Sequence, residues 1–512
     1  MGRIARREVL KAASAAAGTA VLGTAGHAAA APVPLRRSTA ADDFPQPQVR
    51  RSRDGLLATQ LDVRFAHNDI PGVGPVWTRT YDGTIPGPTL RVRPGERLEI
   101  AQVNGLPPNE LRPPADTNTP HHLNSFNLHT HGLHVDPSGT ADNVFREFPP
   151  AAAPGLPAPV HHSRIDIPDD HPAGTFWYHP HHHGSTAVQI LGGMAGVIII
   201  EGDVDRVPEI AAARDVTVCV SELKLAHGQV PDVTSEHVLP RTPSTFLVNG
   251  KLNPTITLES GEVQRWRLVN AGGVTVLRVT LDDHPLHRIA QDGITLEKPT
   301  AESTVTLPMG GRADILVRGG KPGTYRLTSA GVPHPLMTAV VTEPRHAPMG
   351  LPQTLPGRRT ALPEPGGRRH LDFRTYDNVF TGAFTSAFRI LGTGETPHAD
   401  PSAGVGDRRW GRFDPHFVNH TVRLGDVEEW VLKNSSRHDI HPFHMHTNHF
   451  LVMSVNGQPL HPPVWRDTVG IRQGGEVVIR VRFQDFTGRS VVHCHNLRHG
   501  DQGMMQVIEY TR

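Results

Sequence analysis

This 512-residue chain has almost no net charge and lacks long apolar runs beyond its N-terminal segment. Its 51 lysine and arginine residues nearly balance 50 aspartate and glutamate residues, which leaves a formal net charge of +1 at pH 7. Such a balance offers no electrostatic basis for binding nucleic acid or an anionic membrane. Beyond the N-terminal segment, no apolar run reaches the length of about 20 residues that a membrane-spanning helix needs. We therefore expect no nucleic-acid partner and no membrane span.

Helical periodicity is likewise scarce, whereas turn-forming residues are plentiful. The chain contains 50 glycines and 47 prolines, a composition that favours β-sandwiches. A segment that alternates apolar and polar residues around a glycine–acid turn occurs three times, at Gly95, Gly261 and Gly425. Each copy is typical of strand, turn and strand. Because the spacing of about 165 residues is that of a domain and not of a solenoid unit, we predict an all-β fold of three consecutive domains.

Cysteine occurs only twice, and one copy lies in a string rich in metal-binding residues. His493, Cys494 and His495 are followed by His499 and Met504. A thiolate, imidazoles and a weak thioether are the ligands that suit a blue-copper electron-transfer site. In an extended segment, the two neighbours of Cys494 point to the face opposite the cysteine. The string therefore predicts two adjacent metal positions joined by covalent bonds.

Three further clusters contain histidines two residues apart, which share one face of an extended strand. They are His129 with His131, His179 with His181, and His444 with His446, the last preceded by His441. Four such clusters in one chain indicate a multinuclear metal site. We assign the adjacent pairs to solvent instead: His121-His122, His161-His162 and His182-His183.

At these residues the chain resembles the multicopper oxidases, in particular three-domain bacterial laccases. The four motifs H-x-H-G, H-x-H, H-P-x-H-x-H and H-C-H-x-x-x-H-x-x-x-x-M occur in this order from His129 to Met504. The resemblance implies cupredoxin-like Greek-key domains and four coppers per chain. It implies that the type 1 copper is held by His441, Cys494, His499 and Met504. It implies that the type 2 copper is held by His129 and His444, and the paired type 3 coppers by His131, His179, His181, His446, His493 and His495.

The three repeat copies differ in their metal-binding residues. Where the first and third copies carry histidine pairs, the middle copy has Arg278 and Thr280. Domains one and three are therefore expected to face each other across a shared copper cluster, with domain two as a metal-free spacer. The predicted ranges are domain one at 45–205, domain two at 210–345, a linker rich in proline, glycine and arginine at 346–369, and domain three at 370–512.

The N-terminal segment has the pattern of an export signal. Arg6-Arg7 is followed by a modest apolar run rich in alanine and by small residues up to Ala31, which is typical of twin-arginine export. We predict a signal peptide at 1–31 and an extracellular or cell-envelope location. With Cys494 assigned to copper, Cys219 has no partner for an intrachain disulfide, and its apolar surroundings predict a buried strand.

The resemblance implies an enzyme that oxidises phenols and aromatic amines, its small-molecule electron donors, by one electron at the type 1 copper. Electrons would pass from Cys494 through His493 and His495, and dioxygen would be reduced to water. An alternative is a metallo-oxidase acting on Cu(I), Fe(II) or Mn(II). The nine methionines form no rich insert, which disfavours Cu(I), because soft thioethers suit that ion. The third interpretation is a copper-binding scaffold without enzymatic activity, which the complete ligand set disfavours.

Two assignments stay open at the level of sequence. Family members place a proton-donating acid after the first motif, and Asp142 is the best match, with Asp136 close by. A second family acid follows the last type 1 histidine, where this chain has Gly500 and then Asp501. Met505 is an alternative to Met504 as axial ligand, but consecutive residues of a strand face opposite ways.

Overall fold

The computed structural model describes residues 44–512 except 111, 232–241, 358–360, 377–386, 393–411 and 437–438. The predicted signal peptide at 1–31 lies outside the described residues, and so does part of the predicted linker. Within the described part, no helix is both long and apolar enough to cross a lipid bilayer. Nearly all regular structure is β-strand, arranged in six sheets.

The first two sheets come from the N-terminal third of the chain. One contains, in spatial order, β1 (Val49–Arg51), β4 (Thr89–Val92), β9 (Gly196–Ile200), β8 (Gly174–His179) and β6 (His129–His131). The other contains β3 (Gly74–Tyr81), β2 (Leu56–Ile70), β5 (Arg97–Asn104) and β7 (Val160–Asp166). Apolar residues from both sheets, such as Leu61, Leu98 and Ile198, share one buried cluster. The pair therefore forms a β-sandwich.

The middle of the chain repeats this arrangement. Its larger sheet contains β11 (Ser244–Val248), β10 (Arg214–Lys224), β13 (Val263–Ala271), β18 (Arg312–Arg318), β15 (Leu286–Gln291) and β16 (Ile294–Glu302). Its smaller sheet contains β12 (Thr255–Glu259), β20 (Met337–Thr342), β19 (Gly323–Ser329), β14 (Leu277–Leu281) and β17 (Val305–Leu307). The shared core includes Trp266, Ile315 and Val279. Cys219 is fully buried in β10, as predicted.

The C-terminal part forms the third sandwich. One sheet contains β22 (Ala387–Gly392), β21 (Gly367–Tyr376), β24 (Val427–Asn434), β29 (Glu476–Arg482), β26 (Phe450–Val455) and β27 (Gln458–Arg466). The other contains β23 (Val418–Arg423), β31 (Met505–Thr511), β30 (Gly488–Cys494), β25 (His441–Met445) and β28 (Thr468–Ile471). The described helices are short: α1 (Thr186–Ile190), η1 (Val204–Arg206), α2 (Pro208–Ala212) and α4 (Leu497–Asp501). These three sandwiches confirm the predicted all-β class.

Strand order shows that the three sandwiches are copies of one plan. The run β4-β9-β8-β6 in the first corresponds to β12-β20-β19-β14 in the second and β23-β31-β30-β25 in the third. The first pair of each run is parallel, and the remaining pairs are antiparallel. The histidine motifs fall on the equivalent strands β6 and β25, and at the ends of β8 and β30. The repeat therefore puts both metal-binding faces at matching positions.

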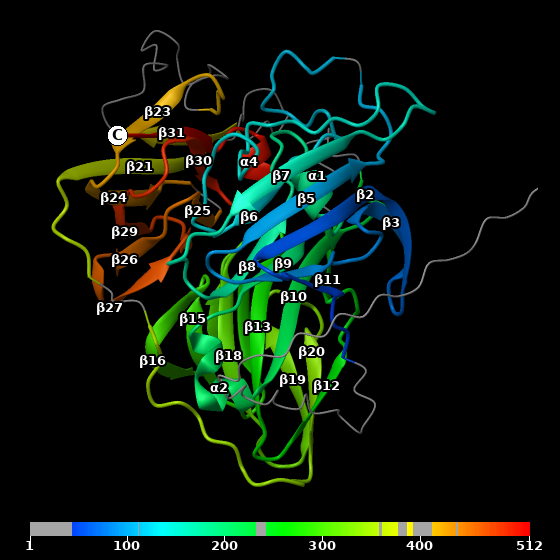
Figure 1. The fold of residues 1–512 in the computed structure, drawn as a ribbon, viewed down its shortest axis with the longest axis vertical. Coiled ribbons are helices and arrows are strands. Elements are labelled where there is room, and N and C mark those ends of the chain that lie inside the picture. Colours follow the sequence, from blue (N-terminus) through cyan, green and yellow to red (C-terminus); the bar gives the residue numbers. More distant parts are fainter. Residues whose placement is uncertain are drawn as a thin grey trace, which may run out of the picture. The chain divides into compact units, whose positions relative to one another are not determined.

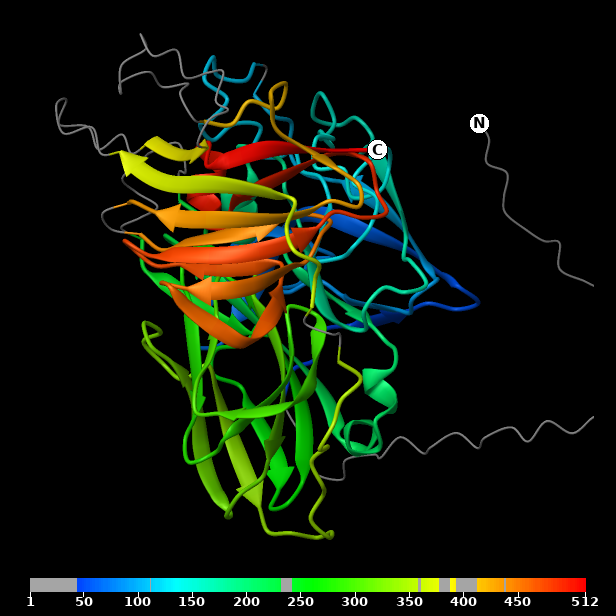
Figure 2. The same ribbon diagram turned by 90° about the vertical axis from the view of Figure 1, so that its left-hand side faces the viewer.

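The first and third sandwiches lie side by side, with the second beside both (Figure 1). Blue and cyan strands of the first face orange and red strands of the third, while the green strands of the second extend away from them (Figure 2). Hydrogen-bond contacts between His129 and His444 and between His181 and His493 cross directly between the first and third.

Candidate metal centre

One set of donor atoms lies inside the third sandwich. His441 begins β25, Cys494 ends β30 and His499 lies in α4. The Cys494 sulfur is 3.4 Å from His441 Nδ1 and 3.6 Å from His499 Nδ1, and the two nitrogens are 3.2 Å apart. Donors held about 2.0–2.3 Å from one ion have separations of this size. All three side chains are buried, so these donors fit a copper ion of the blue type.

The two methionines beside this set pack in different places. Met504 donates its backbone N–H to the carbonyl of His499, and its own carbonyl accepts from the Cys494 N–H. Its side chain belongs to the same buried cluster as Cys494. Met505 packs instead in a separate cluster with Val491 and Val507. Only Met504 therefore shares the apolar surroundings of the thiol, as strand alternation predicted.

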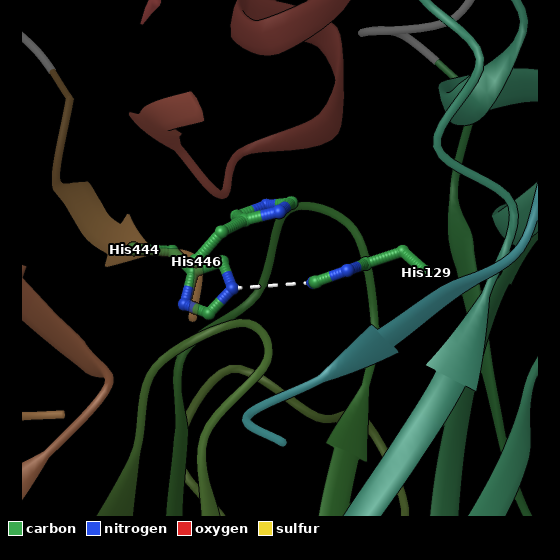
Figure 3. A group of neighbouring side chains, drawn as sticks. All are labelled: His129, His444 and His446. Carbon is green, nitrogen blue, oxygen red and sulfur yellow. Dashed lines mark hydrogen bonds between the residues drawn. The ribbon is translucent and has the colours of Figure 1, made fainter. Parts of the chain in front are cut away.

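Eight histidines form a second set between the first and third sandwiches. His129 stacks on His446 and His131 on His444, each with ring centroids 3.8 Å apart. Figure 3 shows His129 reaching from the first sandwich toward His444 and His446 of the third, with the two Nε2 atoms of His129 and His444 3.4 Å apart. Further Nε2 atoms meet where His493 lies 3.1 Å from His181 and 3.2 Å from His446. The set is completed by His179 and His495.

The orientation of several rings is set by an oxygen on their outer side. In each case one ring nitrogen meets that oxygen, and the other nitrogen faces a neighbouring donor of its own set. For two rings the oxygen belongs to a side chain: His129 meets the Asp142 carboxylate, and His131 meets the side chains of Asp467 and Thr468. For three rings it is a backbone carbonyl: that of Pro180 for His179, that of Asp467 for His444, and that of Cys494 for His493. His441 is held in the same way by Ser436 Oγ at 2.6 Å. Such outer partners are typical of metal-bound histidines, because they select the tautomer.

Burial keeps the imidazoles neutral. It lowers the pKa of His179 and His444 to about 3 and that of His493 to about 4. Within the described residues, both ring nitrogens of His495 are buried without a hydrogen-bond partner. A buried polar atom left unpaired costs about 1–3 kcal/mol, so these nitrogens point to a bound ion. Burial also raises the pKa of the Cys494 thiol, and a thiolate there requires a cation.

Two buried carboxyl groups lie near the donor sets. Both Asp142 oxygens are 3.0 Å from His129 Nδ1, and burial raises the pKa of Asp142 to about 7. Asp136 instead accepts hydrogen bonds from Ser138, so Asp142 is the acid beside the histidines. The Asp501 carboxylate accepts from the N–H groups of Gly184 and Ala187 near α1, and burial raises its pKa to about 7.

The second sandwich supports the histidine set through an arginine side chain. Comparing the three repeat copies of the sequence did not reveal this role. Arg312 of β18 is fully buried and forms two hydrogen bonds with Asp467, of 2.7 and 2.6 Å. Asp467 in turn contacts His131 and, through its carbonyl, His444. Burial raises the pKa of Asp467, but the charge and hydrogen bonds of Arg312, together with His444 and His449, make the net shift downward. The middle sandwich is therefore more than a spacer.

A glycine makes room for this contact and explains the last letter of H-x-H-G. Gly132 has a φ of +87°, and a Cβ there would lie 2.2 Å from Arg312 Nη2 and 2.5 Å from Asp467 Oδ2. The left-handed conformation and the close approach both require glycine. No sequence pattern marks Arg312 or Asp467 themselves, because neither lies within a histidine motif.

Two of the adjacent histidine pairs that we assigned to solvent lie together. His121 and His122 contact His182, with ring centroids 6.0 and 6.4 Å apart, and the three side chains are half-buried. His161 stacks on Phe148 at 4.6 Å. The sequence could not reveal the first contact, since the two pairs are far apart along the chain.

Comparison with known proteins agrees with these donor sets. Family models described as multicopper oxidase match residues 117–205, 217–343 and 393–512. The chain belongs to the multicopper oxidase family. Membership identifies it as a copper oxidoreductase.

Several relatives within this family have been described under different functions. A laccase of Bacillus stratosphericus is 26% identical, over 91% of this chain and 98% of its own length. The cell division protein FtsP of Dickeya dadantii is 26% identical, over 94% and 95%. A solved structure, a multicopper oxidase from Campylobacter jejuni described as a metallo-oxidase, is 24% identical with a TM-score of 0.69, covering 92% of this chain and 96% of its own. The structural likeness confirms the predicted cupredoxin-like fold.

Proposed function

We propose that this multicopper oxidase is laccase-like: it oxidises phenols and aromatic amines by one electron and reduces dioxygen to water. The observation that carries the proposal is the junction at Cys494. Its sulfur belongs to the donor set inside the third sandwich, while His493 and His495 on either side belong to the set of eight histidines. A continuous covalent path therefore joins an electron-accepting site to a multinuclear one.

Each donor set has a proposed occupant. Copper supplies one-electron redox chemistry and dioxygen binding when it is present. The proposed type 1 ligands are His441, Cys494, His499 and Met504. The proposed type 2 ligands are His129 and His444, and the type 3 ligands are His131, His179, His181, His446, His493 and His495. This assignment predicts four coppers per chain.

The protein's own groups position the donors and supply protons. The outer oxygens on His129, His131, His179, His444 and His493 hold each ring with one nitrogen free for metal. We propose that the Asp142 carboxyl is a proton relay, because it lies against His129 Nδ1 at the edge of the histidine set. Asp501 is a weaker candidate, since both of its oxygens already accept backbone hydrogen bonds.

The experiment that tests the proposal combines metal analysis with kinetics. Copper-loaded protein should contain about four coppers per chain, show an intense blue absorption band, and consume dioxygen with a methoxy-substituted phenol. Metal analysis showing a single copper, or a colourless loaded protein, would exclude the ligand assignment. No dioxygen uptake with any donor would favour a copper-binding scaffold instead.

A metallo-oxidase is the second candidate, and the same preparation separates it from a laccase. The reason to test this activity is that the similar Campylobacter jejuni structure is described as a metallo-oxidase. Steady-state kcat/KM is compared for the phenol, Cu(I), Fe(II) and Mn(II). A higher value for any of the metal ions than for the phenol would overturn the laccase-like assignment.

We further propose twin-arginine export from Arg6-Arg7, tested by whether replacing both with lysine retains the protein in the cytoplasm.

A further inference from the structure

A third group of metal-binding side chains lies outside the two buried sets. It consists of His122 in the loop before β6, Glu147 between β6 and β7, and His182 between β8 and α1, with one donor atom from each within 4.8 Å of the others. His122 Nδ1 is 3.0 Å and His182 Nε2 3.8 Å from the same Glu147 oxygen, Oε1. Two donors about 2.1 Å from one ion cannot be more than about 4.2 Å apart. Both distances therefore fit a shared ion.

The surrounding residues hold this group in place. Ser125 Oγ donates a 2.6 Å hydrogen bond to Glu147 Oε1, and the Ser125 N–H donates to the His122 carbonyl. His122 has a φ of +45°, a conformation that is uncommon for residues other than glycine and that persists only where the surroundings impose it. His182 Nδ1 lies 3.3 Å from Ser185 Oγ, which directs Nε2 toward Glu147. An outer partner on the second nitrogen is a feature of metal-bound histidine.

The group is open to solvent on one side. The side chains of His122 and His182 are 20% and 13% exposed, and that of Glu147 is 40% exposed. An ion can therefore reach the donors directly, and water can complete its coordination. Two imidazoles with one carboxylate suit Cu²⁺ and Zn²⁺, whereas Mg²⁺ and Ca²⁺ prefer oxygen ligands alone.

We propose that His122, Glu147 and His182 form an additional site that binds one divalent transition-metal ion, Cu²⁺ or Zn²⁺. None of its donors is a ligand of the four proposed coppers. His182 directly follows His181 of the histidine set, so the additional ion would be bound at the surface next to the buried cluster. The site does not depend on the proposed oxidase function.

The test uses the copper-loaded full chain and Zn²⁺ as probe. Zn²⁺ binding is measured by isothermal titration calorimetry, with bound metal counted after equilibrium dialysis. Glu147→Gln removes the charge at constant size, and His122→Ala removes one imidazole. His162→Ala is the matched control, because His162 is an exposed histidine from the same sandwich. The melting temperature of each variant reports whether it has folded.

Wild type and His162→Ala should each bind one Zn²⁺ at this site. Glu147→Gln and His122→Ala should bind it at least about tenfold more weakly, because even outer-sphere partners contribute about 10- to 100-fold to metal affinity. In addition, one equivalent of Cu²⁺ should add an electron paramagnetic resonance signal with nitrogen couplings in wild type, and this signal should be weaker in Glu147→Gln. Equal Zn²⁺ affinity in wild type and Glu147→Gln would overturn the proposal. Loss of binding in His162→Ala would overturn it as well. If His122→Ala does not fold, Glu147→Gln decides alone.

Discussion

Arg312 allows a sharp test of whether the second sandwich supports the metal centre. Its guanidinium forms two hydrogen bonds with the Asp467 carboxylate, and both side chains are almost fully buried. Arg312→Lys keeps the charge but cannot reproduce the paired geometry. Losing one hydrogen bond to a charged group should cost about 1.5–3 kcal/mol of stability. Arg312→Met, which leaves Asp467 buried and unpaired, should cost about 3–5 kcal/mol.

The effect on metal binding follows from what Asp467 contacts. Its carboxylate lies 3.3 Å from His131 Nε2, and its carbonyl lies 2.9 Å from His444 Nδ1. When Arg312 no longer fixes Asp467, both rings lose part of their orientation. Because outer partners of metal ligands contribute about 10- to 100-fold to affinity, Arg312→Lys should bind the copper of the histidine set about tenfold more weakly, with type 2 copper as the fraction visible by electron paramagnetic resonance. The blue band of the Cys494 site should stay unchanged, since Arg312 is not in contact with it.

The assay is dialysis against a series of chelator concentrations, followed by copper analysis and electron paramagnetic resonance. Arg265→Lys is the control, because Arg265 is another buried arginine of the second sandwich whose ion-pair partners, Asp205 and Asp314, do not include Asp467. Both variants should melt at lower temperature, and only Arg312→Lys should lose type 2 copper at low chelator concentration. Full retention of type 2 copper by Arg312→Lys, or equal loss by Arg265→Lys, would refute the reasoning.

Three further variants test the donor sets. Cys494→Ser should abolish the blue band and phenol oxidation while metal analysis still finds copper at the histidines; retained turnover would show that electrons enter elsewhere. Met504→Leu should raise the type 1 reduction potential, because a weak thioether ligand stabilises Cu(II), whereas Met505→Leu should leave it unchanged in a redox titration; the reverse result would reassign the axial ligand. Asp142→Asn should lower the rate of dioxygen consumption by about 100-fold without slowing anaerobic bleaching of the blue band, and Asp136→Asn should change neither; equal effects would remove Asp142 as the proton relay.

Much of the metal centre could be predicted from the sequence because its donors follow short-range rules. Histidines two residues apart share a strand face, and the neighbours of Cys494 point away from its sulfur. The structure brings His181 and His493 within hydrogen-bond distance and packs Met504, not Met505, with Cys494. Alternation along single strands decides which side chains share a face, whereas the approach of His181 to His493 also needs the packing of the first sandwich on the third.

Interactions between distant segments could not be predicted in this way. In the sequence Asp142 is the best match for the acid, but Asp136 is close enough to confuse the assignment, and only the folded loop puts Asp142 against His129. The contact between His122 and His182 likewise depends on how two loops pack. From the sequence alone we assign the pairs His121-His122 and His182-His183 to solvent. No local pattern encodes such packing, because the partners are far apart along the chain and belong to no common element.

The sequence by itself determined the all-β class, the threefold repeat and the histidine and cysteine donors, since each is encoded in local periodicity or in a motif. The tertiary structure decided which outer groups hold those donors. Arg312 is the clearest case, because it comes from a sandwich without histidine motifs and is linked to His131 by hydrogen bonds through Asp467 of another sandwich. A buried charge needs such a partner, and the pairing with Asp467 exists only after the second and third sandwiches have packed together.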